Sequence, residues 1–286
     1  MIGAVVDCLA CPYCGQPLAE AGSTLRCGAG HSFDLARQGY VTLLPRGSRG
    51  GGGDTAGMVA ARDRFLAVGH YAQLARLLAA AAAGAAAGAV LDVGAGTGHH
   101  LAAVLDALPG RPGVALDLSR YAARRAARAH PRAGAVVADA WRGLPVRTGV
   151  AGLVLDIFSP RNGAETARVL APGGTLLVVT PGGDHLAELV AALGLLTVDE
   201  RKDERLAGAL APHLEPVDRA EHRWTLTLSP ADAVAAAAMG PSAHHLDPAD
   251  LARRAGRLPD PMTTTASVVL SRHRRPGPER PRAAAR

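Results

Sequence analysis

The chain has 286 residues, of which 48% are hydrophobic and 20% are charged, and its formal net charge is +6. This length suits one large domain, or one domain with a small module, and the apolar content is sufficient for a real core. No uninterrupted apolar run reaches the length of a membrane span, and the composition excludes a disordered chain. No secretory signal opens the sequence. We therefore expect a cytoplasmic protein with no membrane partner.

Basic residues concentrate at the C-terminal end. The segment 271–286 holds six arginines and one acid, Glu279, for a net charge of +5, so the other 270 residues are almost neutral. We expect residues 272–286 to form a disordered basic tail. Such a tail is either a solvated end or a phosphate-binding segment.

All four cysteines lie within the first 27 residues, which indicates a site rather than thiols scattered through a core. Cys11 and Cys14 enclose a Pro-Tyr turn that Gly15 follows, and His31 lies four residues after Cys27. Two ligand pairs at this spacing suit tetrahedral Zn²⁺ held by three thiolates and one imidazole. Four protein ligands leave no open position, so we predict a structural zinc.

The fourth cysteine, Cys8, offers an alternative pair with Cys11. We favour Cys11 with Cys14, because a proline and a glycine tighten that turn, and predict that Cys8 is a spare thiol. An iron–sulfur cluster is the other chemical interpretation, but His31 suits the fourth zinc position. A disulfide framework is not needed in a chain of this size.

A glycine-rich stretch, residues 46–57, has the composition of a flexible linker. Apolar residues at helical spacing then predict a helix pair from Met58 to about Ala87, interrupted at Gly69-His70-Tyr71. The predicted organisation is a zinc-binding RNA-recognition module at 1–45, the linker at 46–57, a main domain at 58–271 and the tail at 272–286.

The main domain opens with an apolar strand, Ala89–Val93, that ends in a glycine-rich turn. Gly94, Gly96 and Gly98 let a ligand lie against the backbone at the carboxyl end of this strand. The spacing is G-x-G-x-G, whereas a turn that cradles a pyrophosphate has G-x-G-x-x-G. This difference favours S-adenosylmethionine over a dinucleotide.

Later strands alternate with helices, which predicts an α/β fold with a mostly parallel, doubly wound, Rossmann-like sheet. Asp117 closes the second strand, where a carboxylate can accept hydrogen bonds from both ribose hydroxyls, and Ser119 caps the next helix. Asp139 closes the third strand, at a position that suits recognition of adenine. Further strands are expected at 152–158, after the Leu-Ala-Pro-Gly-Gly turn at 170–174, at 224–228 and at 266–270.

The helix after Ser119 is rich in arginine. Arg120, Arg124 and Arg128 follow the i, i+4, i+8 spacing of one helical face, and no acid lies between Arg120 and Arg132. This face either grips phosphates or is an ordinary solvated surface.

Together these motifs resemble a known family. The glycine turn, the acid after the second strand and the L-x-P-G-G turn are similar to those of class I S-adenosylmethionine-dependent methyltransferases. With the zinc module, residues 53–58 (Gly-Asp-Thr-Ala-Gly-Met) and Gly69-His70-Tyr71, nearly the whole chain before the tail resembles bacterial 23S ribosomal RNA (guanine-N1)-methyltransferases. Arg161-Asn162 and residues 239–242 resemble the actinobacterial branch, whose members modify a guanine in a domain II hairpin loop and confer resistance to tylosin-like macrolides.

The resemblance implies roles for individual residues. It assigns the zinc ligands to Cys11, Cys14, Cys27 and His31, in agreement with the spacing. Without it, Tyr71 would be interpreted as a helix-end tyrosine with a satisfied hydroxyl. His185 would be interpreted either as a residue on the ligand side of the sheet or as a surface histidine that caps a turn. The expected S-adenosylmethionine-binding residues are Tyr71, Gly94, Gly96, Thr97, Gly98, Asp117, Asp139 and His185.

Methyl transfer requires an in-line approach of the guanine nitrogen to the sulfonium methyl, so we expect positioning to supply most of the catalysis. Guanine N1 is protonated at neutral pH and lies on the pairing edge, so the base must be unpaired or flipped. Phe158 and Ser159 lie where related enzymes hold the target base and are the predicted catalytic residues; the general base is not identified. Phe158 either stacks on the base or packs in the core.

The expected partner is 23S ribosomal RNA, read through its shape and phosphates by the zinc module and by arginines. A monomer and a homodimer are both compatible with the sequence. Two rival functions are a small-molecule methyltransferase, which would not need the zinc module, and an RNA-binding protein that has lost methyl transfer. The intact glycine turn and Asp117 argue against the second rival.

Overall fold

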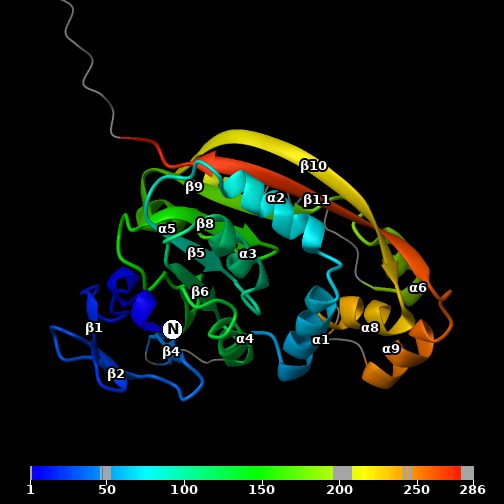
Figure 1. Cartoon of the computed structure of the whole chain (residues 1–286), viewed down its shortest axis with the longest axis horizontal. Helices are drawn as coiled ribbons and strands as arrows, with labels where there is room; N and C mark the ends of the chain where they lie inside the picture. Colours follow the sequence, from blue (N-terminus) through cyan, green and yellow to red (C-terminus); the bar gives the residue numbers. More distant parts are fainter. Residues whose placement is uncertain are drawn as a thin grey trace, which may run out of the picture.

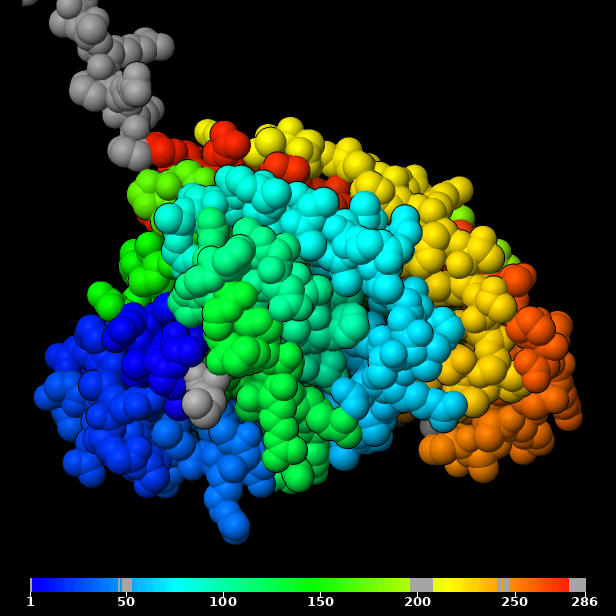
Figure 2. Space-filling model, in the orientation of Figure 1, coloured from blue at the N-terminus to red at the C-terminus, as the bar shows by residue number. Residues whose placement is uncertain are grey.

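The computed structural model of the chain describes residues 2–45, 47, 53–195, 208–240, 243 and 247–277. Two 3-10 turns, η1 (Ile2–Ala4) and η2 (Val6–Cys8), precede a small antiparallel sheet of β1 (Leu18–Ala21), β2 (Thr24–Cys27) and β3 (Ser32–Asp34). This N-terminal module lies at one end of the molecule and packs directly against the body of the chain (Figure 1, Figure 2).

A large mixed sheet forms the body, in the order β10-β11-β9-β8-β5-β6-β7-β4. Its two strands at one side are β10 (Glu215–Leu228) and β11 (Met262–Arg274). The strands from β9 to β4 run parallel to one another. β11 pairs antiparallel with β9, and β10 pairs antiparallel with β11. This topology confirms the predicted doubly wound α/β sheet. The parallel strands are β4 (Tyr40–Thr42), β5 (Ala89–Val93), β6 (Gly113–Asp117), β7 (Ala133–Val137), β8 (Ala151–Ile157) and β9 (Leu170–Pro181).

Both faces of the sheet are covered, and β5, β7 and β8 are buried along their whole length, as parallel strands usually are. On one face Leu74, Leu101 and Leu105 of the helices in front of the sheet in Figure 1 join the core. On the other face Leu9 and Leu25 of the N-terminal module join a second core cluster. After α1 and α2, which are described below, the helices among the described residues include α3 (His99–Ala107), α4 (Arg120–Ala126), α5 (Gly163–Val169), α6 (Ala187–Leu193), α8 (Pro230–Ala238) and α9 (Pro248–Ala255).

The N-terminal module is continuous with the large sheet. Its last strand, β4, pairs in parallel with β7, and the Leu43 amide donates to the Val137 carbonyl at 2.9 Å. The Ala10 amide donates to the Pro145 carbonyl at 3.0 Å. Positions 46 and 48–52 of the expected linker lie outside the described residues. The boundary expected at residue 45 therefore comes directly after a strand of the main sheet.

The expected helix pair is confirmed as α1 (Ala56–Ala67) and α2 (Ala72–Ala82), with the break at Gly69-His70-Tyr71. Helix α1 starts within the expected linker, because the Thr55 hydroxyl accepts from the Met58 amide at 3.3 Å and caps it. No single helix among the described residues is long and apolar enough to cross a membrane. Together α1 and α2 meet the length and composition criteria, but an 81° bend separates them.

The two closing strands are much longer than predicted. β10 spans Glu215–Leu228 and β11 spans Met262–Arg274, and both arch along the top of the molecule in Figure 1. Residues 272–274, expected to begin a disordered tail, belong to β11, because β9 and β10 offer it backbone partners on both sides. The rest of the expected tail from residue 278 lies outside the described residues, as do Pro241 and Ser242.

Two smaller expectations also change. Strand β7 ends at Val137, so Asp139 lies two residues beyond the strand instead of closing it. Helix α4 ends at Ala126, so Arg128 lies in the following turn and the expected three-arginine helical face is reduced to Arg120 and Arg124. Arg132 donates to the carbonyls of residues 105, 108 and 111, which makes it an internal brace.

Candidate functional site

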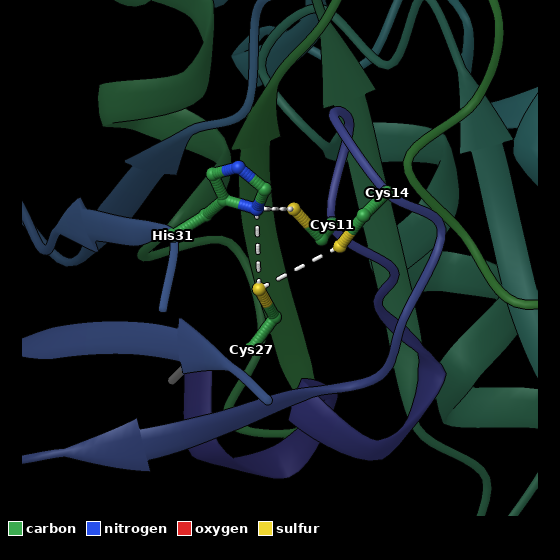
Figure 3. A group of neighbouring side chains, drawn as sticks. All are labelled: Cys11, Cys14, Cys27 and His31. Carbon is green, nitrogen blue, oxygen red and sulfur yellow. Dashed lines mark hydrogen bonds between the residues drawn. The ribbon is translucent and has the colours of Figure 1, made fainter. Parts of the chain in front are cut away.

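The N-terminal module gathers four metal-binding side chains. Ligand atoms of Cys11, Cys14, Cys27 and His31 all lie within 4.8 Å of one another (Figure 3). The Sγ atoms of Cys14 and Cys27 are 3.6 Å apart, and Nδ1 of His31 lies 3.5 Å from Cys11 Sγ and 3.4 Å from Cys27 Sγ. Tetrahedral Zn²⁺ with ordinary bond lengths would separate such ligands by roughly 3.6–3.8 Å. The cluster therefore has the dimensions of a zinc site.

The hydrogen bonds of the cluster favour the thiolate form of Cys27, which is the form that binds zinc. Although burial opposes it, hydrogen bonding to the backbone and ring of His31 lowers the pKa of the Cys27 thiol to about 6. The fourth cysteine, Cys8, stands outside the cluster, and burial raises the pKa of its thiol. The expectation that Cys8 is a spare thiol agrees with this placement.

The glycine turn between β5 and α3 is fastened to the end of β6. The amides of Gly94 and Ala95 donate to the Leu116 carbonyl at 2.8 and 2.9 Å. Gly94, Gly96 and Gly98 all have positive φ values (73°, 55° and 79°), which glycine adopts without steric cost. The turn thus presents bare backbone at the carboxyl edge of the sheet, where open α/β folds bind ligands.

Asp117 lies beside this turn, at the end of β6. One carboxylate oxygen accepts from the Gly96 amide at 2.8 Å and the other from the Ser119 amide at 2.7 Å. Burial raises the pKa of Asp117, although these two hydrogen bonds and the charge of Arg62 oppose the shift. Each carboxylate oxygen can accept a further hydrogen bond.

Tyr71, Phe158 and His185 meet at the same edge, although they come from three distant parts of the chain. The Tyr71 hydroxyl lies 3.0 Å from Nε2 of His185. The Phe158 ring centroid is 6.2 Å from that of Tyr71 and 5.7 Å from that of His185. Of the expected site residues, these three form one aromatic cluster.

The contacts of His185 with Ser267 bear on its tautomer. Nδ1 lies 2.7 Å from the Ser267 carbonyl, which can only accept, and 3.2 Å from the Ser267 amide, which can only donate. The shorter contact, to the carbonyl, favours a proton on Nδ1. In that tautomer Nε2 is an acceptor, and the Tyr71 hydroxyl donates to it. Burial raises the pKa of Tyr71, so the phenol keeps this proton at neutral pH.

Phe158 has a strained backbone and an exposed ring. Its φ is +54°, which is uncommon for a bulky residue, and the residue is 39% exposed. Ser159 donates its hydroxyl to the Val93 carbonyl of β5 at 2.6 Å and so anchors the segment that holds Phe158 in this conformation. Strain of this kind concentrates at functional sites.

Comparison with known proteins agrees with both halves of this geometry. A family model described as "RlmA, N-terminal", a zinc ribbon, matches residues 9–49. A Streptomyces fradiae protein named 23S rRNA (guanine(748)-N(1))-methyltransferase is 53% identical, over 93% of this chain and 96% of its own. A Micromonospora griseorubida protein named "Putative 23S rRNA (guanine-N(1)-)-methyltransferase" is 51% identical, over 93% of this chain and 97% of its own. The chain belongs to the 23S rRNA (guanine-N1)-methyltransferase family.

As a member of this methyltransferase family, the chain has the class I fold that binds S-adenosylmethionine, and its N-terminal ribbon is a zinc-binding module. The residues present fit both groups. The zinc donors have tetrahedral spacing. The glycine turn and the Asp117 carboxylate offer a close-approach surface and acceptors for a ribose.

Thr97 and Asp139 are the two expected cofactor-binding residues that lie outside the hydrogen bonds of the glycine turn with Asp117 and outside the aromatic cluster. Thr97 lies within the glycine turn and is buried. The amide of the preceding residue, Ala138, donates to the Asp117 carbonyl at 3.0 Å. Asp139 therefore lies beyond the end of β7, the strand next to the one that Asp117 ends. Its carboxylate accepts from the Trp141 amide at 3.0 Å and lies 3.5 Å from Arg142. Its role in adenine binding stays a prediction.

Two residues beside the glycine turn, Asp54 and Arg62, were not expected as site residues from the sequence. They form an ion pair beside the glycine turn, and the Asp54 carbonyl accepts from the Ser119 hydroxyl at 2.6 Å. A Cβ at Gly53 would come within 2.9 Å of the Ser119 amide, so only glycine allows this close approach. Gly53-Asp54-Thr55 belongs to the stretch that resembles the family, but its position next to Ser119 and Asp117 depends on tertiary structure.

Proposed function

We propose that this chain transfers the methyl group of S-adenosylmethionine to N1 of a guanine in a domain II hairpin loop of 23S ribosomal RNA. The observation that carries the proposal is the Tyr71-Phe158-His185 cluster beside a glycine turn, in a chain whose zinc ribbon packs against the same sheet. A small-molecule methyltransferase would leave the ribbon unexplained. We propose the residues of the cluster and of the turn as the residues of the site.

The RNA-facing surface is proposed to include a groove between the zinc ribbon and the loop that leads into β8. This hollow of about 620 Å³ is lined by Tyr13 of the ribbon on one side and by Arg142 and Arg147 on the other. Arginine side chains suit phosphates, and an exposed tyrosine suits a nucleobase. Because the ribbon forms one side of this groove, residues 1–45 are proposed to be the RNA-recognition module.

Trp141 is a second proposed RNA contact. It is 66% exposed, in a chain with 3% aromatic residues, and it immediately precedes Arg142. Its loop is held in place, because the Asn162 side chain donates to the Ala140 carbonyl at 3.1 Å and Glu165 accepts from the Leu144 amide at 2.7 Å. An aromatic ring on a fixed loop at the carboxyl edge of the sheet is suited to stack on an unpaired base.

The reaction requires modest chemistry from the chain. When bound, S-adenosylmethionine would supply the methyl group of its sulfonium to guanine N1 and would leave as the neutral thioether, and the N1 proton would leave to solvent or to a base. Phe158 is proposed to stack on the unpaired guanine and hold its edge toward the methyl. Ser159 is proposed to act through position, by fixing the Phe158 backbone against β5.

The biological role proposed for this activity is resistance to tylosin-like macrolides, exercised in the cytoplasm where ribosomes are modified. This part rests on the resemblance to the actinobacterial branch and is tested by the drug sensitivity of a strain that lacks the gene. A strain without the gene should become more sensitive to tylosin. Unchanged sensitivity would leave the methylation as housekeeping.

The decisive experiment is methyl transfer from labelled S-adenosylmethionine to unmodified large-subunit RNA, mapped by primer extension. A methyl at guanine N1 blocks base pairing, so one strong stop at a hairpin guanine is the expected result. Labelled RNA without a stop would contradict the N1 position. No label in RNA, with cofactor bound, would contradict the RNA substrate and leave a small-molecule methyltransferase.

A further inference from the structure

The side chain of Arg62 lies over the glycine turn. A Cβ placed on Gly96 would meet Arg62 Cδ at 3.3 Å and Nη1 at 3.5 Å, so the guanidinium covers this point of the turn. Arg62 comes from α1, outside the large sheet, and nothing in the glycine motif predicts it.

Arg62 is fixed in this position from two sides. Nη1 pairs with the Asp54 carboxylate, and Nη2 donates to the Met239 carbonyl, at the end of α8, at 2.9 Å. Asp54 is itself tied to Ser119 through its carbonyl. Within the described part of the chain, Nε carries no hydrogen bond. The arginine is therefore preorganised, and its Nε–H is still available near the turn.

Arg62 and the start of helix α3 lie together at the turn, next to the carboxylates of Asp54 and Asp117. Helix α3 begins at His99, with Gly98 as its N-cap, so its free amide groups point to the same region. His100, the second residue of α3, is half-buried; desolvation, with the charges of His99 and Arg62 adding to it, lowers its pKa to about 3, so the ring is neutral. A cation and a helix start together favour a carboxylate.

S-adenosylmethionine carries one carboxylate, on its methionyl end, and its ribose hydroxyls suit Asp117. We propose that Arg62 binds this methionyl carboxylate, with Asp54 and the Met239 carbonyl holding the guanidinium in place. The inference rests on the proposed methyltransferase function but concerns cofactor binding alone. In this proposal the role of the Gly53-Asp54-Thr55 segment is to position the guanidinium of Arg62 through the Asp54 carboxylate.

The test compares two ligands that differ only in the carboxylate. Binding of S-adenosylhomocysteine and of its decarboxylated analogue, which keeps the amine, is measured by calorimetry on the full zinc-loaded chain without RNA. Arg62→Ala should weaken S-adenosylhomocysteine binding about tenfold to a hundredfold and change binding of the decarboxylated analogue less than about twofold. Arg62→Lys, which keeps the charge, should lose less than Arg62→Ala.

The matched control is Arg64→Ala on the same helix, whose side chain is 59% exposed and faces Asp232. It should leave both affinities unchanged. Equal weakening of both ligands by Arg62→Ala would reduce Arg62 to a structural brace and overturn the proposal, as would an unchanged affinity for S-adenosylhomocysteine. Because no RNA is present, a failure of the rRNA assignment would not alter this result, whereas absence of any nucleoside binding would refute the methyltransferase function itself.

Discussion

The Tyr71 hydroxyl donates a hydrogen bond to His185 Nε2 across 3.0 Å, although 114 positions separate the two residues in the sequence. Neither residue belongs to the glycine motif, yet both lie beside the segment that carries Phe158. This bond joins the start of α2 to the turn between β9 and α6, beside the proposed cofactor site.

Removing this hydrogen bond should weaken cofactor binding. Tyr71→Phe leaves Nε2 of His185 without its donor, and we expect S-adenosylhomocysteine affinity to fall about twofold to tenfold. Calorimetry measures the effect. Tyr121→Phe, at an exposed tyrosine beside Arg120, is the control and should change nothing. An unchanged affinity in Tyr71→Phe would remove Tyr71 from the cofactor site.

Phe158 allows stability and activity to be separated. Phe158→Gly relieves a positive φ, so we expect the thermal midpoint to stay the same or rise, while rRNA methylation falls about tenfold or more through loss of stacking. Differential scanning fluorimetry and the labelled-methyl assay read the two effects. A variant that methylates normally would show that the ring is packing and does not contact the target base.

Trp141 should contribute to RNA binding without affecting the cofactor. Trp141→Ala is expected to lower affinity for the target hairpin about fivefold to a hundredfold, with S-adenosylhomocysteine affinity unchanged. Val68→Ala, at another exposed apolar side chain, serves as the control. Filter binding at two salt concentrations measures both variants. If Trp141→Ala binds RNA like the parent, the stacking contact does not exist.

Zinc removal should destabilise the whole chain. Because the ribbon shares a core with the large sheet, we expect a single thermal transition that chelation or Cys27→Ser shifts downward. Cys8→Ala should retain full zinc content, since Cys8 lies outside the ligand cluster. Two separate transitions, with the upper one indifferent to zinc, would contradict a shared core.

The buried carboxyl of Asp92 predicts a pH dependence of stability. Burial, with the charges of Asp117 and Asp156 adding to it, raises the pKa of Asp92 to about 8, against about 3.9 in an unfolded chain. The folded state therefore holds a proton that the unfolded state releases. Its contribution to stability is complete below about pH 4 and is lost as the pH rises to about 8.

His100 acts in the opposite direction. Its lowered pKa gives a contribution that is complete above about pH 6.5 and is lost as the pH falls, so His100 does not mask Asp92 above about pH 6.5. Cys27, whose pKa is lowered to about 6, gives an opposite slope up to about pH 8.5, but this slope is the same in the parent and in Asp92→Asn. Between about pH 6.5 and 8 the difference in stability between the two proteins should therefore change by on the order of 1 kcal/mol per pH unit in urea denaturation, because Asp92→Asn cannot ionise. An identical slope in both proteins would assign the dependence to other groups.

Local spacing was enough to predict the features whose residues are close in sequence. Cys11, Cys14, Cys27 and His31 fall within one short stretch, and the glycine turn with its following acid is a strand-turn-helix signal. The alternation of strands and helices likewise predicted the sheet. These elements depend on neighbouring residues, so the sequence carries them directly.

Features that depend on long-range packing could not be predicted in this way. Nothing near Arg62 indicates that it covers Gly96, and nothing in Tyr40–Thr42 indicates a partner at Ala135–Val137. β11 extends into the basic end because two neighbouring strands pair with it, which overrides a composition typical of disorder. Tertiary partners, not local propensity, decided these positions.

The pairing of β4 with β7 has an evolutionary consequence. A ribbon that supplies the outermost strand of the catalytic sheet, and packs Val5 where Gly134 has no side chain, cannot be exchanged by simple end-to-end fusion of genes. A ribbon from another protein that lacks a strand matching β4 would leave the backbone edge of β7 without hydrogen-bond partners, and an exposed edge promotes aggregation. Chimeras that aim to retarget such an enzyme must therefore carry the recipient's own Tyr40–Thr42 and Gly134 surface, with the crossover placed before β4.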